Sequence, residues 1–381
     1  MTVQPFRINV SQDILDDLQL RLTNTRWPDA VDDAAWEYGT NLDYLKEVVE
    51  YWRNDYDWRL HEAALNQFDH FRADIDGIGI HFIHQRGHGP NPTPVLLTHG
   101  WPDSFYRMVK IIPMLTNPAA FGGDPDSSFD VIVPSIPGFG FSDRVQKRGM
   151  TTRKIADCFA RLMRDVLGYD RFAAAGGDMG TEVTMHLAHQ YPDSLIGIHL
   201  TDVSYPMSPP DGVEMSDMSN AYMADLHQWW MAEGAFNMLQ STKPQTLGYG
   251  LTDSPVGLAG WIIEKFRTWS DCGGNVETRF SKDDLLTNIM IYWVTATISS
   301  STRLYFEGVR SDDTLYPAPR IDVPVGIAKF VTEILPPREW VEHAMNVQHW
   351  TEFEQGGHFA ALEEPKLYAA DIRDFLQNLN A

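Results

Sequence analysis

An aspartate stands at the centre of a short glycine-rich segment, Gly176-Gly177-Asp178-Met179-Gly180. An apolar run precedes this segment and a helical pattern follows it, which predicts a sharp turn from a strand into a helix. In hydrolases with such a turn, the central residue is the nucleophile and is usually a serine. The free N–H groups at the start of the helix would favour a negative charge there. Taken alone, the segment is equally compatible with a simple N-cap aspartate.

A histidine follows this turn in the order that such hydrolases use, which is nucleophile, acid, histidine. His358 lies in EQGGHFAALEEP, after the last predicted strand and before the last helix. Glu333 follows the strand predicted at 323–330 and is the favoured acid, whereas Asp202, after an earlier strand, is the alternative. A carboxylate attacks an electrophilic carbon without first losing a proton, and water activated by the histidine can then hydrolyse the ester.

Two backbone N–H groups can stabilise the negative charge that develops during ester hydrolysis. The segment HGWP follows an apolar strand pattern, and a turn there would direct the N–H of Trp101 into the site. Met179 directly follows the nucleophile, so its N–H at the start of the predicted helix would be the second donor. We therefore predict an oxyanion hole at Trp101 and Met179, and expect both side chains to line the substrate pocket.

No cofactor is expected from the sequence. His81, His84 and His88 lie on a predicted hairpin without a matching set of cysteines or carboxylates, so we predict no metal ion there. The segment IPGFGFSD at 136–143 contains part of a G-x-G pattern, but no third glycine and no acidic ribose partner follow.

The elements that position these groups follow from the alternation of apolar runs with helical patterns. Strands are predicted within 94–100, 129–138, 171–178, 195–202, 323–330 and 349–357. This alternation predicts an α/β fold with a mostly parallel sheet and helices on both faces. Asp76-Gly77, between alternating residues, predicts a hairpin before these strands.

The chain divides into four stretches. Residues 1–90 carry amphipathic helical patterns, which predict an extension that packs on the rest. Residues 91–204 and 318–381 are the two parts of the α/β core. Residues 205–317 are helical in pattern and rich in Trp, Tyr and Met, which predicts a lid inserted between two strands. In such sheets ligands bind beyond the carboxyl ends of the strands, so the lid would cover the site.

Composition narrows the range of partners. The 30 basic and 52 acidic residues give a formal charge of −22, which disfavours binding to nucleic acid or to an anionic membrane surface. No apolar run is long enough to span a membrane, and MTVQPFRINVSQD lacks a signal-peptide pattern. The expectation is a cytoplasmic enzyme that acts on a small molecule, and the sequence is compatible with a homodimer.

Several motifs, in order, resemble the microsomal-type epoxide hydrolases of the α/β-hydrolase superfamily. They extend over nearly the whole chain and are RWPD, HGWPDSFY, PSIPGFGFSD, GGDMG, LQSTKPQTLGYGLTDSPVGLAGWIIEKFRTW, DDLLTNIMIYW and GGHFAALEEP. The resemblance implies that an epoxide and water give a vicinal diol through an alkyl ester on Asp178, with His358 as the base and Glu333 as its partner. It also implies that the N-terminal extension wraps the core.

The family uses two lid tyrosines to assist the departing epoxide oxygen, and this chain matches one of them. The match is Tyr305 in SSSTRLYFEG; the other position, before QSTKP, holds Phe236, which has no donor and would line the pocket. Tyr305 could act alone, Tyr222 or Tyr249 could replace the missing hydroxyl, or the alignment could shift slightly.

Two other functions are compatible with parts of this pattern. A haloalkane dehalogenase also attacks with an aspartate but needs halide-binding donors, which Met179 lacks and Trp101 could supply. A non-catalytic binding homologue would fit the lost hydroxyl at Phe236, but the intact nucleophile, base and acid argue against it.

Overall fold

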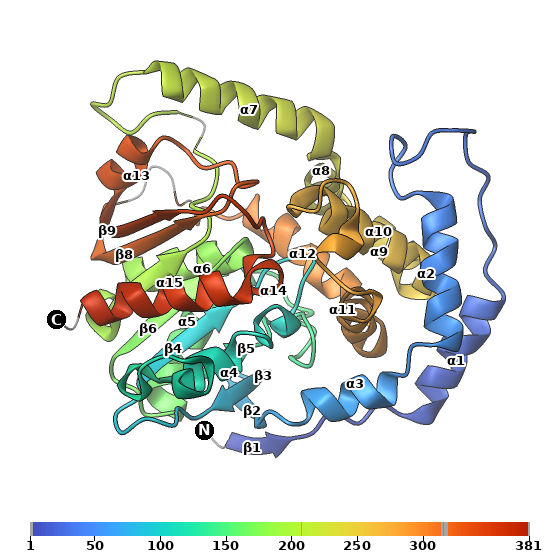
Figure 1. Ribbon diagram of the computed structural model, residues 1–381, viewed down its shortest axis with the longest axis horizontal. Helices are drawn as coiled ribbons and strands as arrows, with labels where there is room; N and C mark the ends of the chain where they lie inside the picture. Colours follow the sequence, from blue (N-terminus) through green and yellow to red (C-terminus); the bar gives the residue numbers. More distant parts are fainter. Residues whose placement is uncertain (1–2, 207, 314, 316–318, 380–381) are drawn as a thin grey trace.

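A nine-stranded sheet forms the centre of the protein, in the order β1-β2-β3-β5-β4-β6-β7-β8-β9 (Figure 1). The computed structural model describes residues 3–206, 208–313, 315 and 319–379. The strands are β1 (Val3–Phe6), β2 (His70–Ile75), β3 (Ile78–Gln85), β4 (Thr93–Thr98), β5 (Phe129–Pro134), β6 (Phe172–Gly176), β7 (Leu195–Leu200), β8 (Ile321–Lys329) and β9 (Met345–Glu352). β1, β2, β3 and β5 pair antiparallel in turn. All other pairs are parallel, which confirms the predicted sheet.

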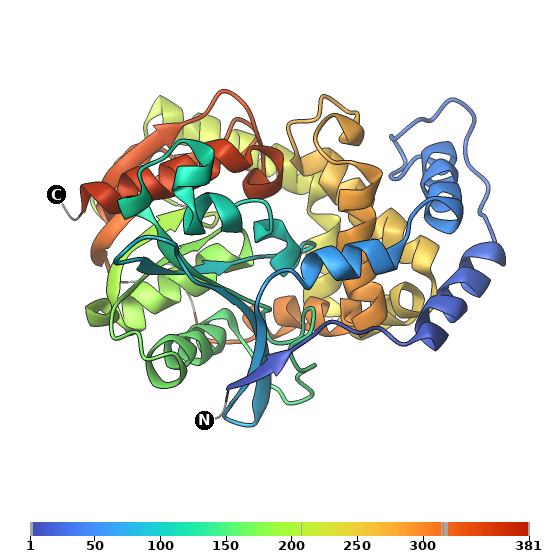
Figure 2. The same cartoon turned by 60° about the horizontal axis from the view of Figure 1, so that its bottom comes forward.

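Helices cover both faces of this sheet (Figures 1 and 2). α4 (Ile112–Thr116) and α15 (Pro365–Asn378) lie on one face, and α5 (Thr152–Arg161) and α6 (Met179–Gln190) lie on the other. Because both faces are covered, the central parallel strands are continuous apolar runs, and every residue of β5 and β6 is buried.

The N-terminal segment combines one strand with three helices. β1 pairs with β2 at the edge of the sheet, a strand that the sequence did not predict. α1 (Gln12–Thr23), α2 (Leu42–Asn54) and α3 (Trp58–Leu65) then pack against lid helices α10 and α11. The predicted hairpin at Asp76-Gly77 joins β2 and β3. The predicted boundary at residue 90 therefore falls after three strands of the central sheet.

The lid lies between β7 and β8, and its described residues form helices without a strand. These helices are α7 (Asp217–Glu233), α8 (Ala235–Thr242), α9 (Pro244–Asp253), α10 (Pro255–Trp269), α11 (Lys282–Thr295) and α12 (Ile298–Gly308). Serine N-caps begin three of them. Ser216 accepts from the N–H of Ser219 at 3.2 Å, Ser254 accepts from the N–H of Gly257 at 2.9 Å, and Ser281 forms a capping box with Asp284. The predicted lid boundary at 317 and 318 lies outside the described residues.

The chain returns to the core after the lid. α13 (Arg338–Ala344) connects β8 to β9, and α14 (Ala360–Glu363) precedes α15. The parallel strands all end at the same edge of the sheet, beneath the lid (Figure 1). The loops that follow β4, β6, β7, β8 and β9 are therefore brought together at this edge.

Candidate active site

Asp178 lies at the turn between β6 and α6 with φ 58° and ψ −129°, a conformation that is strained for a residue with a side chain. The turn is tight on both sides. A Cβ on Gly176 would overlap the backbone of Gly180, and a Cβ on Gly180 would overlap the backbone of Thr98. The flanking glycines are thus required by close backbone approach, and the aspartate side chain is presented beyond the sheet.

The structure brings the three predicted groups together. His358 follows β9, and its Nε2 lies 3.4 Å from Oδ2 of Asp178. Its Nδ1 lies 2.9 Å from Oε1 of Glu333, which follows β8. The imidazole therefore stands between the two carboxylates, and each comes from the loop after a different strand.

These carboxylates control the charge of His358. Burial alone would lower the pKa of the imidazole, but the charges of Glu333 and Asp178 outweigh burial and raise that pKa to about 10. Near neutral pH the resting site thus holds an imidazolium against the carboxylate of Asp178. Any reaction that removes the charge of Asp178 would weaken this stabilisation of the protonated form.

Asp202, the alternative acid, contacts the turn and not the imidazole. Its Oδ2 accepts the backbone N–H of Asp178 at 2.6 Å and the hydroxyl of Thr181 at 3.0 Å. Burial and the nearby charge of Glu333 raise the pKa of Asp202 to about 7. Glu333 is the carboxylate that contacts His358, and Asp202 supports the strained backbone of Asp178.

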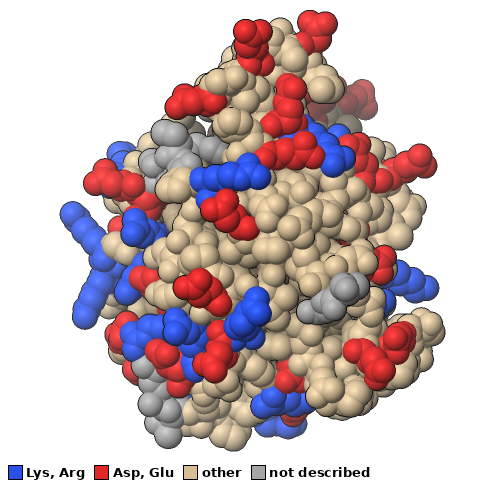
Figure 3. Space-filling model, turned by 90° about the vertical axis from the view of Figure 1, so that its left-hand side faces the viewer, with Lys and Arg blue, Asp and Glu red and all other residues tan. Residues whose placement is uncertain are grey.

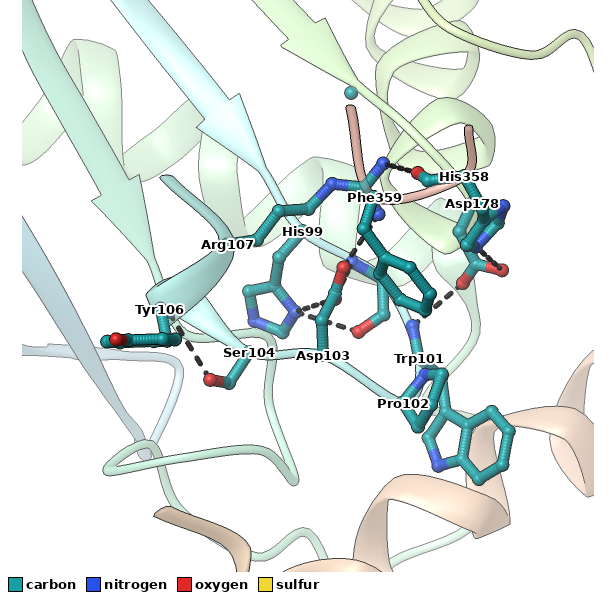
Figure 4. Close-up of polar contacts among 12 residues, drawn as sticks. His99, Trp101, Pro102, Asp103, Ser104, Tyr106, Arg107, Asp178, His358 and Phe359 are labelled. Atoms are coloured by element: carbon teal, nitrogen blue, oxygen red, sulfur yellow. Dashed lines mark hydrogen bonds and ion pairs between the residues drawn. The ribbon is translucent and has the colours of Figure 1, made fainter. Parts of the chain in front are cut away.

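The loop after β4 supplies a backbone donor to the carboxylate of Asp178. The N–H of Trp101 donates to Oδ1 of Asp178 at 2.8 Å (Figure 4). Met179 is the first residue of α6, where a backbone N–H has no acceptor within the helix. Of the two N–H groups predicted for an oxyanion hole, that of Met179 is thus next to Asp178 in the chain, and that of Trp101 contacts its carboxylate.

A buried ion pair connects this loop to the loop of the histidine (Figure 4). Asp103 accepts the N–H of Gly100 at 2.8 Å and binds Arg107 at 2.6 Å. Arg107 in turn donates to the backbone carbonyl oxygen of His358 at 2.5 Å. This pair was not predicted from the sequence, although the spacing of four residues in DSFYR allows such contact. It positions the loop of Trp101 and the loop of His358 relative to each other.

A cavity of about 570 Å³ lies between Asp178 and the lid. Asp178, His358, Glu333 and Met179 line its core side, and aromatic residues dominate its lid side. Those aromatic residues are Trp229, Trp230, Phe236, Trp269 and Tyr305. The Trp101 ring, predicted to line the pocket, is fully buried and stacks on Phe236 with centroids 5.4 Å apart. Phe236 therefore presents its surface to the cavity in place of Trp101.

Comparison with known proteins identifies the family. The sequence matches the family described as Epoxide hydrolase N terminus over residues 3–108 and the alpha/beta hydrolase fold over 93–241. A protein of Stigmatella aurantiaca (strain DW4/3-1) is 43% identical over 100% of this chain and 86% of its own length. Epoxide hydrolase 1 of Sus scrofa is 38% identical over 98% of this chain and 88% of its own length. This chain belongs to the epoxide hydrolases.

Solved structures support the same family. The crystal structure of juvenile hormone epoxide hydrolase from the silkworm Bombyx mori has a TM-score of 0.86 and 30% identity, and the match covers 100% of this chain and 94% of that one. Aspergillus niger epoxide hydrolase has a TM-score of 0.87 and 27% identity, with 100% and 97% covered. The predicted family and the α/β-hydrolase fold are confirmed. No helix in the described part of the chain is long and apolar enough to cross a membrane.

In this epoxide hydrolase the lid offers one tyrosine of the expected pair. Tyr305 lines the cavity and packs edge-on against Phe236 at 6.0 Å, and its hydroxyl makes no hydrogen bond within the described residues. Burial and the charge of Asp178 raise the pKa of Tyr305 well above its usual value, so its hydroxyl keeps its proton.

Neither suggested replacement for the second tyrosine lines the cavity. Tyr222 packs against Trp340 with centroids 5.7 Å apart, and Tyr249 is 70% exposed. Tyr205, which the sequence analysis did not single out, does line the cavity and stacks on Trp229 at 6.0 Å. Tyr205 could have been predicted as a cavity residue from its place in the loop after β7, because ligands bind at that edge of the sheet.

The histidines of the hairpin make contacts within the protein. Nδ1 of His81 lies 2.9 Å from the hydroxyl of Ser135, and Nε2 of His84 lies 3.1 Å from that of Tyr169. Among the residues that the structure describes, no three His, Cys, Asp or Glu side chains are grouped to hold a metal ion. His88 lies beyond the end of β3.

Proposed function

We propose that this chain converts an epoxide into a vicinal diol through an alkyl ester on Asp178. The observation that carries the proposal is the contact of His358 with Asp178 at 3.4 Å and with Glu333 at 2.9 Å, at the base of a cavity of about 570 Å³. The names of the relatives, which are epoxide hydrolases, support the same reaction.

In the first step, a carboxylate oxygen of Asp178 attacks an epoxide carbon from the side opposite the breaking C–O bond. The C–O bond of the strained ring breaks as the ester bond forms. The departing oxygen then lies toward the lid, where the Tyr305 hydroxyl donates a hydrogen bond or its proton. The imidazolium of His358 balances the charge of the nucleophile before the attack.

In the second step, the ester no longer carries the charge of Asp178. The pKa of His358 then falls, because one of the two carboxylates that raised it has been neutralised. The proton that the imidazolium loses balances the alkoxide formed in the first step, either on the alkoxide itself or on Tyr305 in place of the proton that Tyr305 gave. Neutral His358 takes a proton from water, and the resulting hydroxide attacks the carbonyl carbon of Asp178. The N–H groups of Trp101 and Met179 stabilise the oxyanion, and its collapse releases the diol and restores the carboxylate.

Single-turnover labelling tests this proposal. Enzyme in excess over styrene oxide is reacted in water enriched in oxygen-18, and both the diol and the peptide that contains Asp178 are analysed by mass spectrometry. We expect the label in Asp178 and not in the first diol released, because water attacks the ester carbonyl. Label that enters the first diol directly, with none in the peptide, would contradict the ester.

One observation favours a second candidate, carbon–halogen cleavage by the same aspartate. The indole N–H groups of Trp101 and Trp269 are buried beside the cavity and have no partner within the described residues. Such groups could stabilise a departing halide. Bromide release from a bromoalkane, together with no diol from any epoxide, would favour this reaction over the first.

A further inference from the structure

Glu182 is a carboxyl group in the cavity that the proposed reaction does not use. It lies on α6, four residues after Asp178, and lines the same cavity. The charge of Asp178 acts on Glu182, so the two carboxyl groups lie near each other in this cavity. Glu182 is therefore on the core side of the cavity, beside the nucleophile, while the departing oxygen is on the lid side. A substrate group that extends along α6 would reach it.

The cavity contains an excess of acidic groups. The described residues that line it include five carboxyl groups and no lysine or arginine. These belong to Asp178, Glu182, Asp202, Glu333 and Asp313. The imidazole of His358 is the ionisable base of this lining, and it stands between Asp178 and Glu333.

Glu182 differs from the other four carboxyl groups in its partners. Asp202 accepts hydrogen bonds from the turn, and Asp313 is 3.4 Å from Arg153. Glu182 has the hydroxyl of Thr152 as its hydrogen-bond partner and no ion pair within the described residues. Because it has no cationic partner within the described residues, Glu182 is the carboxyl group of the cavity with which a positively charged ligand could form an ion pair.

Burial and the charge of Asp178 raise the pKa of Glu182 to about 7. A cation placed beside this group would stabilise its ionised form, and the resulting hydrogen bond would be charge-assisted on both sides. A neutral hydroxyl or amide would gain only the weaker hydrogen bond.

We propose that Glu182 makes one end of the cavity a cation-binding subsite. This subsite selects epoxides that carry a protonated amine on a side group away from the epoxide ring. This inference rests on the proposed function and names its substrate class. The aromatic side of the cavity, with Trp229, Phe236 and Trp269, accommodates the apolar part of the same substrate. An epoxide with a carboxylate arm is disfavoured, because it would bring a further negative charge among carboxylates.

The first part of the lid is also acidic. Residues 205–242 contain five acidic residues and no lysine or arginine. Figure 3 shows acidic side chains at the top of the molecule, where α7 lies above the rest of the fold. A surface of this kind raises the local concentration of cations and lowers that of anions.

Three para-substituted styrene oxides of similar size test the subsite. The para group is dimethylaminomethyl, which is protonated at neutral pH, or isobutyl, its neutral carbon isostere, or carboxymethyl, which is an anion. We expect kcat/KM to be at least about tenfold higher for the ammonium than for the isobutyl compound, as for a charge-assisted hydrogen bond. The carboxymethyl compound should be the poorest of the three.

Glu182→Gln should bring the ratio of ammonium to isobutyl kcat/KM close to one, and Glu182→Lys should favour the carboxymethyl compound. The matched control is Asp312→Asn, because Asp312 is exposed, outside the cavity lining and close to it in the chain. That variant loses the same charge and should keep the wild-type ratio. A ratio near one in the wild type, or one that Glu182→Gln leaves unchanged, would overturn the inference.

Binding separates this inference from the proposed function. Calorimetry with 4-(dimethylaminomethyl)benzamide and 4-isobutylbenzamide compares the same two arms without any turnover. Tighter binding of the ammonium amide to the wild-type protein, with no hydrolysis of any epoxide, would support the subsite and reject the reaction. Hydrolysis of all three epoxides, with equal binding of the two amides, would support the reaction and reject the subsite.

Discussion

The core side and the lid side of the cavity differ in how their polar groups are held. On the core side, Asp178 receives the N–H of Trp101 at 2.8 Å, and Asp202 holds its backbone at 2.6 Å. On the lid side, aromatic rings surround Tyr305, whose hydroxyl makes no hydrogen bond within the described residues. In the proposed reaction, the groups for ester formation and hydrolysis are thus preorganised by loops of the sheet, whereas assistance to the departing oxygen is assigned to one hydroxyl.

The largest expected effect is at the nucleophile of the core side. Asp178→Ala should reduce diol formation by about 10⁵-fold or more, as for the loss of a nucleophile elsewhere. The measurement is diol formation from styrene oxide, with circular dichroism to confirm that the variant is folded. Wild-type activity in this variant would show that water attacks the epoxide directly.

The next effect separates the two steps on the core side. His358→Gln should still form the ester but hydrolyse it about 10³-fold more slowly, because the base is absent. Intact-protein mass spectrometry should then show a stable adduct with the mass of one epoxide. Asp178→Ala is the control and should show no adduct. Absence of an adduct in His358→Gln, with slow turnover, would place the imidazole in the first step.

The lid side should respond in the step that breaks the ring. Tyr305→Phe should slow ester formation by about 10²-fold, the usual cost of losing one donor to a developing oxyanion. Stopped-flow measurement of the first turnover checks this rate.

Phe236 occupies the position of the second lid tyrosine, so a tyrosine at this position tests whether a second hydroxyl can replace that of Tyr305. Phe236→Tyr should restore part of the lost rate in the Tyr305→Phe background, because it returns a hydroxyl to the lid. If Tyr305→Phe forms the ester at the wild-type rate, another donor assists the departing oxygen. Tyr205, which lines the cavity, would be the first candidate.

The smallest expected effect is on the titration of His358. The pKa of this imidazole is raised from 6.5 to about 10 despite burial, so its ion pairs stabilise the fold fully below pH 6.5 and are lost as pH rises through about 10. Asp178→Ala removes one carboxylate and should lower this pKa, which NMR titration of the ring can follow. An unchanged pKa would mean that Glu333 alone sets the charge.

The sequence predicted the core side better than the lid side. The turn at Asp178 is a local pattern, and its glycines are required by backbone contacts within a few residues and with Thr98. His358 and Glu333 could be found because parallel strands end at one edge, so the order along the chain also places the groups in space. The family motifs then fixed their identity.

Features that depend on packing between distant elements could not be predicted in this way. β1 pairs Val3 with Ala73, and four residues carry too little pattern to reveal a strand. Helical periodicity did not show that Tyr222 faces Trp340 and that Tyr249 faces outward. Glu182 was detectable in principle from its spacing to Asp178, but its lack of a cationic partner depends on the surrounding elements.

The ion pair between Asp103 and Arg107 has a consequence for how this protein could change. Both residues belong to the core, and the pair connects the loop of Trp101 to the carbonyl of His358 without any lid residue. The lid adds further contacts to the same loops: Asn288 and Tyr292 of α11 donate to the carbonyl oxygens of Pro102 and Asp103, and the carbonyl oxygen of Trp269 in α10 accepts the N–H of His358. New substrate ranges would therefore arise, in nature or by engineering, more readily by changes in α7 and α8, which make none of these contacts, than by replacement of the whole lid.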